Sequence, residues 1–345
     1  MNKSNQHVAI IGAGIAGATL ANKLLSAGYE VSIYEKSRGT GGRMASCRLE
    51  DNSADLGAPF LCPASDIFRQ WLTQQPNVNE WTPSTYRFNG KHCKNQTHFI
   101  ATPKQSSLTR ELIQGANLYT SIRVGYLWPE RNQAPYEEEQ SRVLLRDEHG
   151  KALGHYDAAI VTVPAKQAAP LLEAVPRFVR QVEAATPTIS WVLVIQISSV
   201  VPITAELIQG SHPLLLRCIK DSAKPKRVRE ENSDTWLIEA TPKWSALNSD
   251  SDPKHVAEQL RSAFFAVLNR DFNTQPIITA ERVHRWLYSR HTTAHLDQRL
   301  NVGYLWDANT KIGACGDWLE LGDIEGAWFS ANKLAEQVIL QRELI

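Results

Sequence analysis

Short apolar runs alternate with helical patterns along most of the chain, beginning near the N-terminus. Residues 7–11 and 31–34 are apolar runs that are typical of buried parallel strands. Between them, residues 18–25 carry apolar side chains at helical spacing, and Gly28 closes this helix as its C-terminal cap. The pattern predicts a strand–turn–helix–strand unit at the start of the chain.

The rest of the chain predicts more α/β structure and a separate, mostly antiparallel sheet. Helical spacing predicts helices at residues 106–115, 165–185, 253–268 and after 327. Apolar and β-branched runs predict strands at 122–127, 143–145, 158–163, 190–197, 213–217, 235–240, 284–288 and 311–315, and around Trp81, Tyr86 and Phe88. The runs between residues 190 and 240 belong to the separate sheet, which would be an insertion in the α/β domain.

Three glycines stand in the turn between the first strand and the first helix. Gly12 permits a tight turn, Gly14 lets a pyrophosphate approach the backbone, and Gly17 lets the helix pack closely on the strand. A glycine turn that serves packing alone is the alternative. Because both strands and the helix are in register with the glycines, we expect a dinucleotide-binding site.

The start of this helix and the end of the second strand supply the other contacts of such a site. The backbone N–H groups at Ile15 and Ala16 have no partner within the helix and favour a phosphate. Glu35 follows Gly17 by 18 residues, close to the offset of about 20 at which a carboxylate accepts the ribose hydroxyls. The same negative charge disfavours a 2′-phosphate at that position.

Charge and cysteine content exclude several classes of protein. The 345 residues include 37 Lys and Arg against 36 Asp and Glu, a formal net charge of +1, which gives no support for a nucleic-acid or membrane-surface partner. No apolar run has the roughly 18 residues that span a bilayer, and the N-terminus lacks the pattern of a signal peptide. The five cysteines fit neither a zinc site nor a C-x-x-C pair, so we expect reduced thiols in a cytoplasmic protein without a metal site.

A second glycine-rich segment follows the second strand directly. Lys36 and Arg38 precede the pair Gly41 and Gly42, which permits another close backbone approach, and Arg43 can neutralise a pyrophosphate. This pattern resembles the second phosphate-contact motif of flavoproteins of the glutathione-reductase and amine-oxidase type. It favours FAD over NAD as the cofactor, and a basic surface loop is the alternative.

Several segments spread over the chain together resemble the renalase family, especially its bacterial members. They are residues 39–44, 223–225, 236–245, 284–286, 314–318 and 325–328. The resemblance implies a Rossmann-like FAD-binding domain with an inserted, mostly antiparallel substrate domain, as in p-hydroxybenzoate hydroxylase and the flavin amine oxidases. We expect the FAD-binding domain at residues 1–75, 105–175 and 280–345, and the substrate domain at 76–104 and 176–279.

The resemblance also implies a reaction. The 2- and 6-dihydro forms of NAD(P) would be oxidised to NAD(P)+ by hydride transfer to flavin N5, with O2 reduced to hydrogen peroxide. No catalytic side chain is expected, because hydride loss restores an aromatic pyridinium and the protein only holds the rings together. An amine oxidase or desaturase-type flavoenzyme is one alternative, although no lysine stands in a matching strand context. A non-catalytic flavin-binding redox protein is another.

Further cofactor contacts follow from the same resemblance. The Asp-Leu-Gly-Ala segment at residues 55–58 would run beneath the isoalloxazine. Cofactor contacts are expected here from Gly57, Ala58, Pro59 and Phe60. The backbone of Val124 would reach the adenine, and Pro164 would end a strand close to the adenosine.

The C-terminal part of the chain would complete the cofactor site. In the family, the glycine matching Gly316 lets the chain approach the pyrophosphate, and the aspartate matching Asp317 accepts a hydrogen bond from a ribityl hydroxyl. A helix N-terminus would direct its N–H groups at the pyrimidine end of the flavin, and it comprises Glu325, Gly326 and Ala327.

Substrate contacts are expected from the strand at residues 284–288 and from Glu239. Alternation puts His284, Trp286 and Tyr288 on one face and Arg285 on the other; a packed strand at the domain junction is the alternative. Glu239 stands where the family usually has a histidine. Residues 59–62 and 321–323 also depart from the family pattern, and all three departures fall near the expected flavin or substrate.

One basic stretch allows two interpretations. It contains Lys220, Lys224, Lys226, Arg227 and Arg229 in a polar segment. It is either a solvated loop or a rim that attracts an anionic substrate such as a nicotinamide dinucleotide.

Overall fold

The computed structural model describes residues 6–49, 52–130, 142–198, 203–227, 232–272, 277–292 and 302–343. The chain forms two compact units, of which the first consists of Met1–Gly42, Thr109–Pro187 and Arg290–Ile345 and the second of Arg43–Leu108 and Thr188–Ser289. Four segments lie in the other unit from the one expected: 43–75, 105–108 and 280–289 belong to the second and 176–187 to the first. The first of these segments is held in the second unit because Asp55 is buried against Lys224 and Asp221.

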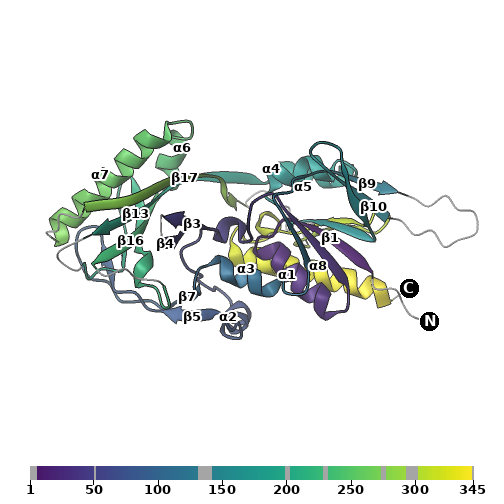
Figure 1. Cartoon of the computed structure of the whole chain (residues 1–345), viewed down its shortest axis with the longest axis horizontal. Helices are drawn as coiled ribbons and strands as arrows, with labels where there is room; N and C mark the ends of the chain where they lie inside the picture. The colour runs from purple at the N-terminus through teal and green to yellow at the C-terminus, as the bar shows by residue number, and fades with distance from the viewer. Residues whose placement is uncertain are drawn as a thin grey trace, which may run out of the picture. The chain divides into compact units, whose positions relative to one another are not determined.

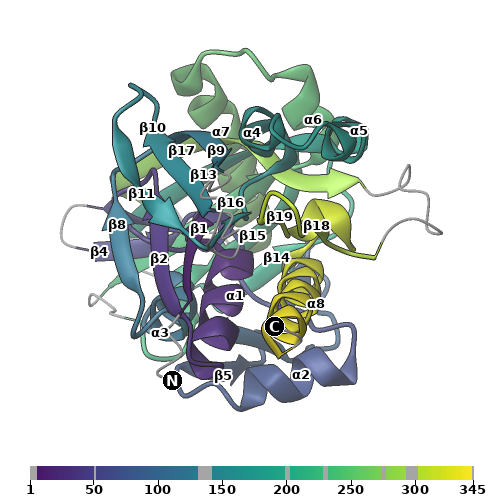
Figure 2. The same ribbon diagram turned by 90° about the vertical axis from the view of Figure 1, so that its right-hand side faces the viewer.

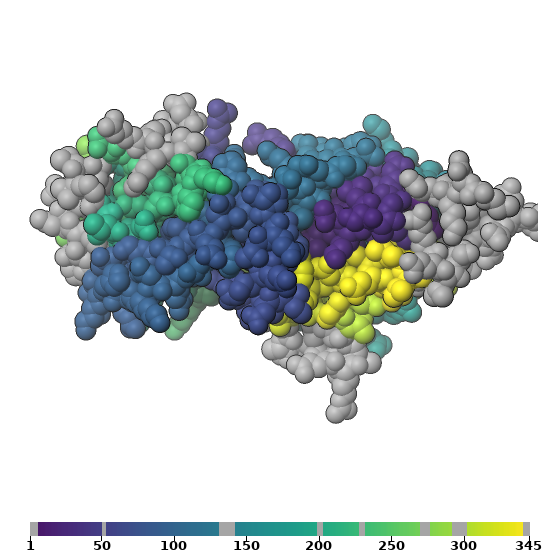
Figure 3. Space-filling view, turned by 90° about the horizontal axis from the view of Figure 1, so that it is seen from below, coloured from purple at the N-terminus to yellow at the C-terminus, as the bar shows by residue number. Residues whose placement is uncertain are grey.

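The first unit is built on a six-stranded sheet. In sheet order its strands are β18 (Leu305–Asp307), β19 (Ile312–Ala314), β12 (Ala158–Val161), β1 (His7–Ile11), β2 (Glu30–Glu35) and β8 (Asn117–Thr120). All neighbours are parallel except the edge pair β18–β19. Helices α1 (Ile15–Ser26) and α8 (Ile324–Glu343) lie side by side over this sheet (Figures 1 and 2). Figure 3 shows the purple N-terminal part and the yellow C-terminal helix adjoining at the surface.

The other face of this sheet is covered by a small sheet and by short helices. The strands are β11 (Ala152–Tyr156), β10 (Arg142–Asp147) and β9 (Val124–Glu130), and the helices are α4 (Ala165–Ala168), η2 (Ala169–Leu172) and α5 (Pro176–Ala184). Ala9 and Ile11 of β1 pack into one buried cluster with Leu145. The single helix expected at 165–185 is interrupted, because Pro170 and Pro176 have no N–H group to continue it.

Parallel pairing brings the carboxyl ends of three strands to one edge of the sheet. Ile11 lies opposite Tyr34 of β2 and opposite Val161 of β12. The residues that follow these three therefore gather at this edge, where open α/β sheets bind ligands. They are Gly12, Glu35 and Thr162.

The second unit contains another six-stranded sheet. In sheet order its strands are β17 (Ile277–Thr292), β13 (Thr186–Ser198), β16 (Ser233–Ala240), β15 (Leu215–Lys220), β14 (Leu207–Gln209) and β6 (Thr85–Arg87). The pairs from β13 to β14 are antiparallel, and β14 pairs with β6 in parallel. This is the separate sheet that the sequence predicts.

Both faces of the second sheet are buried. Helix α7 (Pro253–Phe272) packs Leu260 and Phe264 against Trp236 on one face. Two small antiparallel sheets cover the other face, formed by β3 (Ser46–Leu49) with β4 (Asn52–Asp55) and by β5 (Val78–Trp81) with β7 (His98–Ala101). The remaining helices are η1 (Gly42–Met44), α2 (Asp66–Thr73), α3 (Ser106–Leu112), η3 (Asp221–Ala223), α6 (Pro242–Leu247) and η4 (Asp317–Leu319).

Helix α2 has a local signal that the sequence analysis missed. The Ser65 hydroxyl accepts a hydrogen bond from the Phe68 N–H at 3.2 Å, which caps the helix start. None of the described helices is both long enough and apolar enough to cross a lipid bilayer.

Candidate functional site

Two of the three glycines in the first turn are required by packing. Gly12 has a φ of +113°, and a β-carbon on it would lie 2.8 Å from the Thr162 hydroxyl. A β-carbon on Gly17 would lie 2.1 Å from the Gly12 carbonyl oxygen, so helix α1 could not approach the turn. These two positions agree with the close strand–helix contact that the motif predicts.

Gly14 has no such reason within the protein. Its φ of −78° is open to any residue, and the nearest atom to a β-carbon there would be the Cα of Gly42, at 4.0 Å. Gly42 itself has a φ of +53°, and the Gly41 N–H donates to the Ala13 carbonyl at 2.9 Å. The two glycine loops therefore lie against each other and leave open space at Gly14, where a bound phosphate group would fit.

The start of α1 is free to bind an anion. Gly14 is the N-cap residue and contributes no side-chain cap, and the first turn carries no acidic residue. The N–H groups of Ile15 and Ala16 have no acceptor within the helix. A phosphate placed at Gly14 would satisfy them and would also meet the positive end of the helix dipole.

Glu35 lies where the spacing places it, but its carboxylate already has two partners. One oxygen accepts from the Ala13 N–H at 2.9 Å and the other from the Ser37 N–H at 2.8 Å. Through these two hydrogen bonds the buried Glu35 side chain holds both glycine loops to the end of β2. Each carboxylate oxygen still has a second lone pair for a ribose hydroxyl.

Four further expected contacts belong to the first unit. Val124 is buried at the start of β9, and Pro164 precedes α4 as its N-cap residue. The Lys36 ammonium donates to the Gln167 side chain at 3.0 Å, which links the second glycine-rich loop to α4. Arg38 is exposed to solvent.

The C-terminal motif has hydrogen-bond partners within the first unit. The Gly316 N–H donates to the Ser330 hydroxyl at 2.9 Å. Asp317 is buried, and one of its carboxylate oxygens lies 3.0 Å from Nδ1 of His291, a buried histidine that the sequence analysis did not single out. The carboxylate expected to face a ribityl hydroxyl is thus partly engaged by His291.

The N-terminus of α8 is capped by a side chain of this protein. Asp323 accepts the Gly326 N–H on its carboxylate at 2.8 Å and the Ala327 N–H on its carbonyl at 3.0 Å. The N–H groups expected to face the flavin at these two residues are therefore already used. Glu325 is buried in the first turn of the same helix.

Three separate motifs come together in the second unit. A β-carbon on Gly57 would lie 1.9 Å from the Arg43 carbonyl oxygen, which also accepts the Ala58 N–H at 2.8 Å. The Trp286 indole N–H donates to the Leu56 carbonyl at 3.0 Å. The segment expected beneath the flavin is therefore fixed from both sides, and Gly57 is required at its centre.

Phe60, which follows the buried Pro59, lies in a cluster of polar and aromatic side chains. Its ring stacks on His98 with centroids 4.2 Å apart, and the Arg217 guanidinium lies 4.8 Å from its centroid. Arg217 also forms an ion pair with Glu239, so the acid expected to bind substrate is already balanced. His98 and Arg217 were missed because neither lies in a recognisable motif.

The strand β17 alternates as the sequence predicts. The rings of His284 and Trp286 are 4.5 Å apart, whereas Arg285 donates to the Ser249 carbonyl on the other side. Burial, and then the nearby Arg282, lower the pKa of His284. Tyr288 is half-buried on this strand.

Most of the basic stretch fits neither interpretation. Lys224 is fully buried, 2.8 Å from Asp55 and 2.5 Å from Asp221, and Arg227 pairs with the same two carboxylates. Burial opposes the ionisation of Asp55, but the two cations outweigh it and keep the pKa of Asp55 below its usual range. Lys220 is likewise buried and pairs with Asp234 at 2.9 Å. Lys226 is exposed, and Arg229 lies outside the described residues.

The buried His98 should make the protein sensitive to mild acid. Burial, and then Arg217, lower the pKa of His98 from 6.5 to about 4. The unfolded chain binds this proton below about pH 6.5 and the folded protein does not. The free energy of unfolding should thus be highest above pH 6.5 and should fall by up to about 3 kcal/mol as the pH approaches 4. Urea titrations at pH 7 and pH 4.5 measure the loss, and in His98→Gln it should be smaller; an equal loss in both proteins would contradict the assignment.

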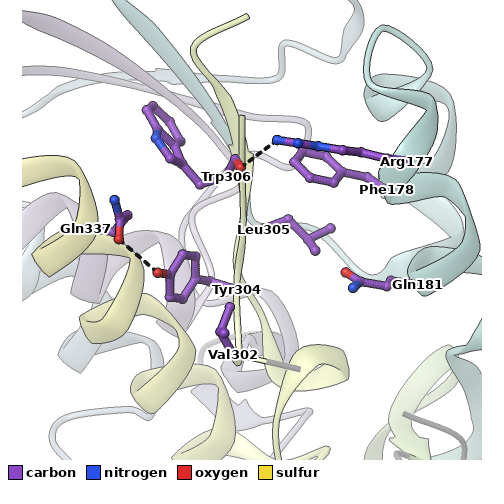
Figure 4. A pocket seen from close by; sticks show the side chains of 8 residues that line it. All are labelled: Arg177, Phe178, Gln181, Val302, Tyr304, Leu305, Trp306 and Gln337. Carbon is purple, nitrogen blue, oxygen red and sulfur yellow. Dashed lines mark hydrogen bonds between the residues drawn. The ribbon is translucent and has the colours of Figure 1, made fainter. Parts of the chain in front are cut away.

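A pocket of about 400 Å3 lies in the first unit, away from the glycine loops. It is lined by Arg177, Phe178, Gln181, Val302, Tyr304, Leu305, Trp306 and Gln337 (Figure 4). Arg177 donates to the Trp306 carbonyl and pairs with Asp307, while Tyr304 donates to Gln337. No residue expected to contact cofactor or substrate lines this pocket.

The comparisons with known proteins agree with this architecture. Residues 10–74 match the family of NAD(P)-binding Rossmann-like domains. The chain is 44% identical over 80 residues to an L-amino-acid oxidase of Siganus canaliculatus and 35% over 85 residues to L-amino acid oxidase Cdc18 of Crotalus durissus cumanensis. It is 35% identical over 66 residues to a 4,4'-diapophytoene desaturase of Staphylococcus aureus. These matches cover 23%, 22% and 19% of this chain but only 15%, 17% and 13% of the relatives.

Solved structures share the fold over nearly the whole chain. A protein assigned as a protoporphyrinogen oxidase from Exiguobacterium sp. 255-15 aligns with a TM-score of 0.68 at 12% identity. A putrescine oxidase triple mutant aligns with the same TM-score at 10% identity. Each alignment covers 98% of this chain and 99% of the other. The Rossmann-like domain with an inserted, mostly antiparallel sheet is thereby confirmed.

Proposed function

We propose that this protein is an FAD-dependent oxidoreductase of the amine oxidase/desaturase type. The observation that carries the proposal is Gly14, since open space lies where its β-carbon would be although its backbone could accept any residue. The uncapped start of α1 beside it and the carboxylate of Glu35 suit a dinucleotide. The relatives that match part of this chain are oxidases and a desaturase.

We further propose that the substrate is an isomeric dihydro-NAD(P), in its 2- or 6-dihydro form. When bound, FAD supplies a ring that accepts a hydride at N5 and passes the electrons to O2, which yields hydrogen peroxide. Loss of hydride makes the substrate ring aromatic, so the chain needs to orient the rings rather than to move a proton. The support is the resemblance of residues 284–286 and 314–318 to the renalase family.

The side chains of the second unit suit a reaction in which the protein orients the rings and transfers no proton. Trp286 holds the backbone at Leu56 through its indole N–H, and the Arg43 carbonyl packs against Gly57, so the segment expected beneath the flavin is fixed in position. Glu239 is balanced by Arg217. We therefore assign these groups a positioning role, and none of them is needed as an acid or base.

Amine oxidation is the second candidate, because two of the relatives are L-amino acid oxidases. The environment of the buried lysines argues against amine oxidation. The two buried lysines of the described residues, Lys220 and Lys224, are both held by carboxylates. Neither presents an unpaired ammonium of the kind that amine oxidases generally place near flavin N5 through a water.

Anaerobic mixing with candidate substrates separates these functions. The purified protein should be yellow with releasable FAD, and 6-dihydro-NAD should bleach the flavin absorbance within seconds. Ordinary NADH, which carries its hydride at C4, is the matched control and should react far more slowly. Readmission of O2 should return the colour with one hydrogen peroxide formed per substrate. Bleaching by primary amines instead would favour the second candidate, and no bleaching by any of these would favour a non-catalytic flavin protein.

A further inference from the structure

A small pocket in the second unit lies beside the strand expected to contact substrate. It has a volume of about 330 Å3 and is lined by Arg48 and Leu49 of β3 and by Ala280, Glu281 and Arg282 of β17. We name it the Arg282 pocket. No residue that the sequence analysis assigned to cofactor or substrate lines it.

Among the described residues that line the Arg282 pocket, positive charges outnumber negative ones. Glu281, the one acid among the described residues that line it, is neutralised from the side of α7, because Arg261 donates to both carboxylate oxygens at 3.0 and 2.9 Å. Arg282 forms no ion pair with any residue that the structure describes. The positive charge of Arg282 acts on two nearby groups. It adds to the effect of burial in lowering the pKa of His284, and it partly offsets the effect of burial that raises the pKa of Cys47.

The position of Arg282 links this pocket to the substrate strand. Ala280 and Trp286 pack into the cluster that includes the β3–β4 hairpin, whereas Val283 packs into the cluster on the opposite side. Alternation therefore places Arg282 on the same face as His284 and Trp286. Four residues of extended strand separate Arg282 from Trp286 by about 14 Å, so one extended ligand could touch both.

We propose that Arg282 forms a phosphate-binding subsite for a dinucleotide substrate. Guanidinium groups bind phosphate oxygens through paired, charge-assisted hydrogen bonds, and a nicotinamide dinucleotide carries a pyrophosphate next to its reacting end. The inference rests on the proposed function and deepens it. Lys220, Lys224 and Arg227 are paired with carboxylates inside the unit and are not available to attract an anionic substrate. We therefore assign that role to Arg282.

The test compares a substrate with and without phosphate groups in the holoenzyme. In Arg282→Gln, the KM for 6-dihydro-NAD should rise about tenfold, with kcat unchanged, while the KM for 6-dihydronicotinamide riboside stays within about twofold of wild type. Arg87→Gln is the matched control, since Arg87 is exposed on β6 at the far edge of the same sheet. It should change neither KM.

A direct binding measurement keeps this inference separate from the proposed reaction. Inorganic pyrophosphate should bind the wild-type holoenzyme in calorimetry and should bind Arg282→Gln about tenfold more weakly. If wild type oxidises neither substrate yet shows this difference, the proposed reaction fails and the anion subsite stands. If Arg282→Gln raises both KM values equally, or leaves KM for the dinucleotide and pyrophosphate binding unchanged, the subsite is refuted.

Discussion

Replacing Lys224 by methionine should destabilise the protein by about 3–5 kcal/mol, because it leaves buried carboxylates short of a cation. Lys224 lies between Asp55 and Asp221, and the side chains of all three are almost completely shielded from water. Arg227 alone would have to balance two negative charges. The measurement is the free energy of unfolding from urea titrations of the purified protein.

A paired substitution distinguishes charge imbalance from lost packing. In Asp221→Asn with Lys224→Met, Asp55 and Arg227 remain as a balanced pair, so most of the lost stability should return. Lys226→Met removes an exposed charge from the same segment and should change stability by less than about 0.5 kcal/mol. A double variant as unstable as Lys224→Met would show that packing, rather than charge balance, dominates at this position.

The same network should have a second effect, on the segment expected beneath the flavin. Asp55 ends β4 and accepts the Gln105 N–H at 2.9 Å, and the Gln105 side chain donates to the Ala58 carbonyl at 3.3 Å. The chain from Asp55 to Ala58 is therefore fixed at both ends. A flavin spectrum altered in Lys224→Met and recovered in the double variant would follow from this coupling.

The parts of the fold that the sequence predicted are those set by short-range pattern. The first strand, helix and second strand, the glycines between them and Glu35 all lie within thirty residues of one another. Their roles follow from local geometry, as in the positive φ of Gly12 and the close approach at Gly17. The alternation of β17 is equally local, and it correctly separates Arg285 from His284 and Trp286.

The parts that could not be predicted depend on partners distant in the chain. Lys224 looks like a surface lysine in a polar segment, and its buried partner Asp55 lies 169 residues away. His98 and Arg217 meet at the ring of Phe60 from three separate segments. The local sequence around each of these residues is that of an ordinary loop or strand, so no periodic pattern reveals the pairings.

The two compact units divide the chain elsewhere than the expected domains, for a related reason. Residues 43–55 follow the second glycine loop without a linker, so the sequence assigned them to the FAD-binding domain. The hairpin they form packs Cys47, Leu49 and Ala54 into the core of the second unit. Burial of a few apolar side chains, together with the charge on Asp55, decided the unit to which this segment belongs.

Replacing Gly14 by valine should remove cofactor binding and leave the apoprotein folded. The backbone at Gly14 has a φ of −78°, and a β-carbon would meet only the Gly42 Cα at 4.0 Å. Loss of the favourable glycine at the N-cap should cost about 1 kcal/mol or less. The side chain would fill the space left for the phosphate, and FAD affinity should fall by at least about 100-fold, or about 2.7 kcal/mol.

The contrast with Gly17→Val makes this result diagnostic. A β-carbon at Gly17 would lie 2.1 Å from a backbone oxygen that cannot move, so the apoprotein itself should lose stability. Gly14→Val should lose only the increase in unfolding free energy that FAD gives to the wild type. Fluorescence titration of the deflavinated proteins with FAD measures the affinity, and urea titration measures the stability without cofactor. Wild-type affinity in Gly14→Val would show that no phosphate lies at this loop, whereas equal instability of both apoproteins would return Gly14 to a packing role.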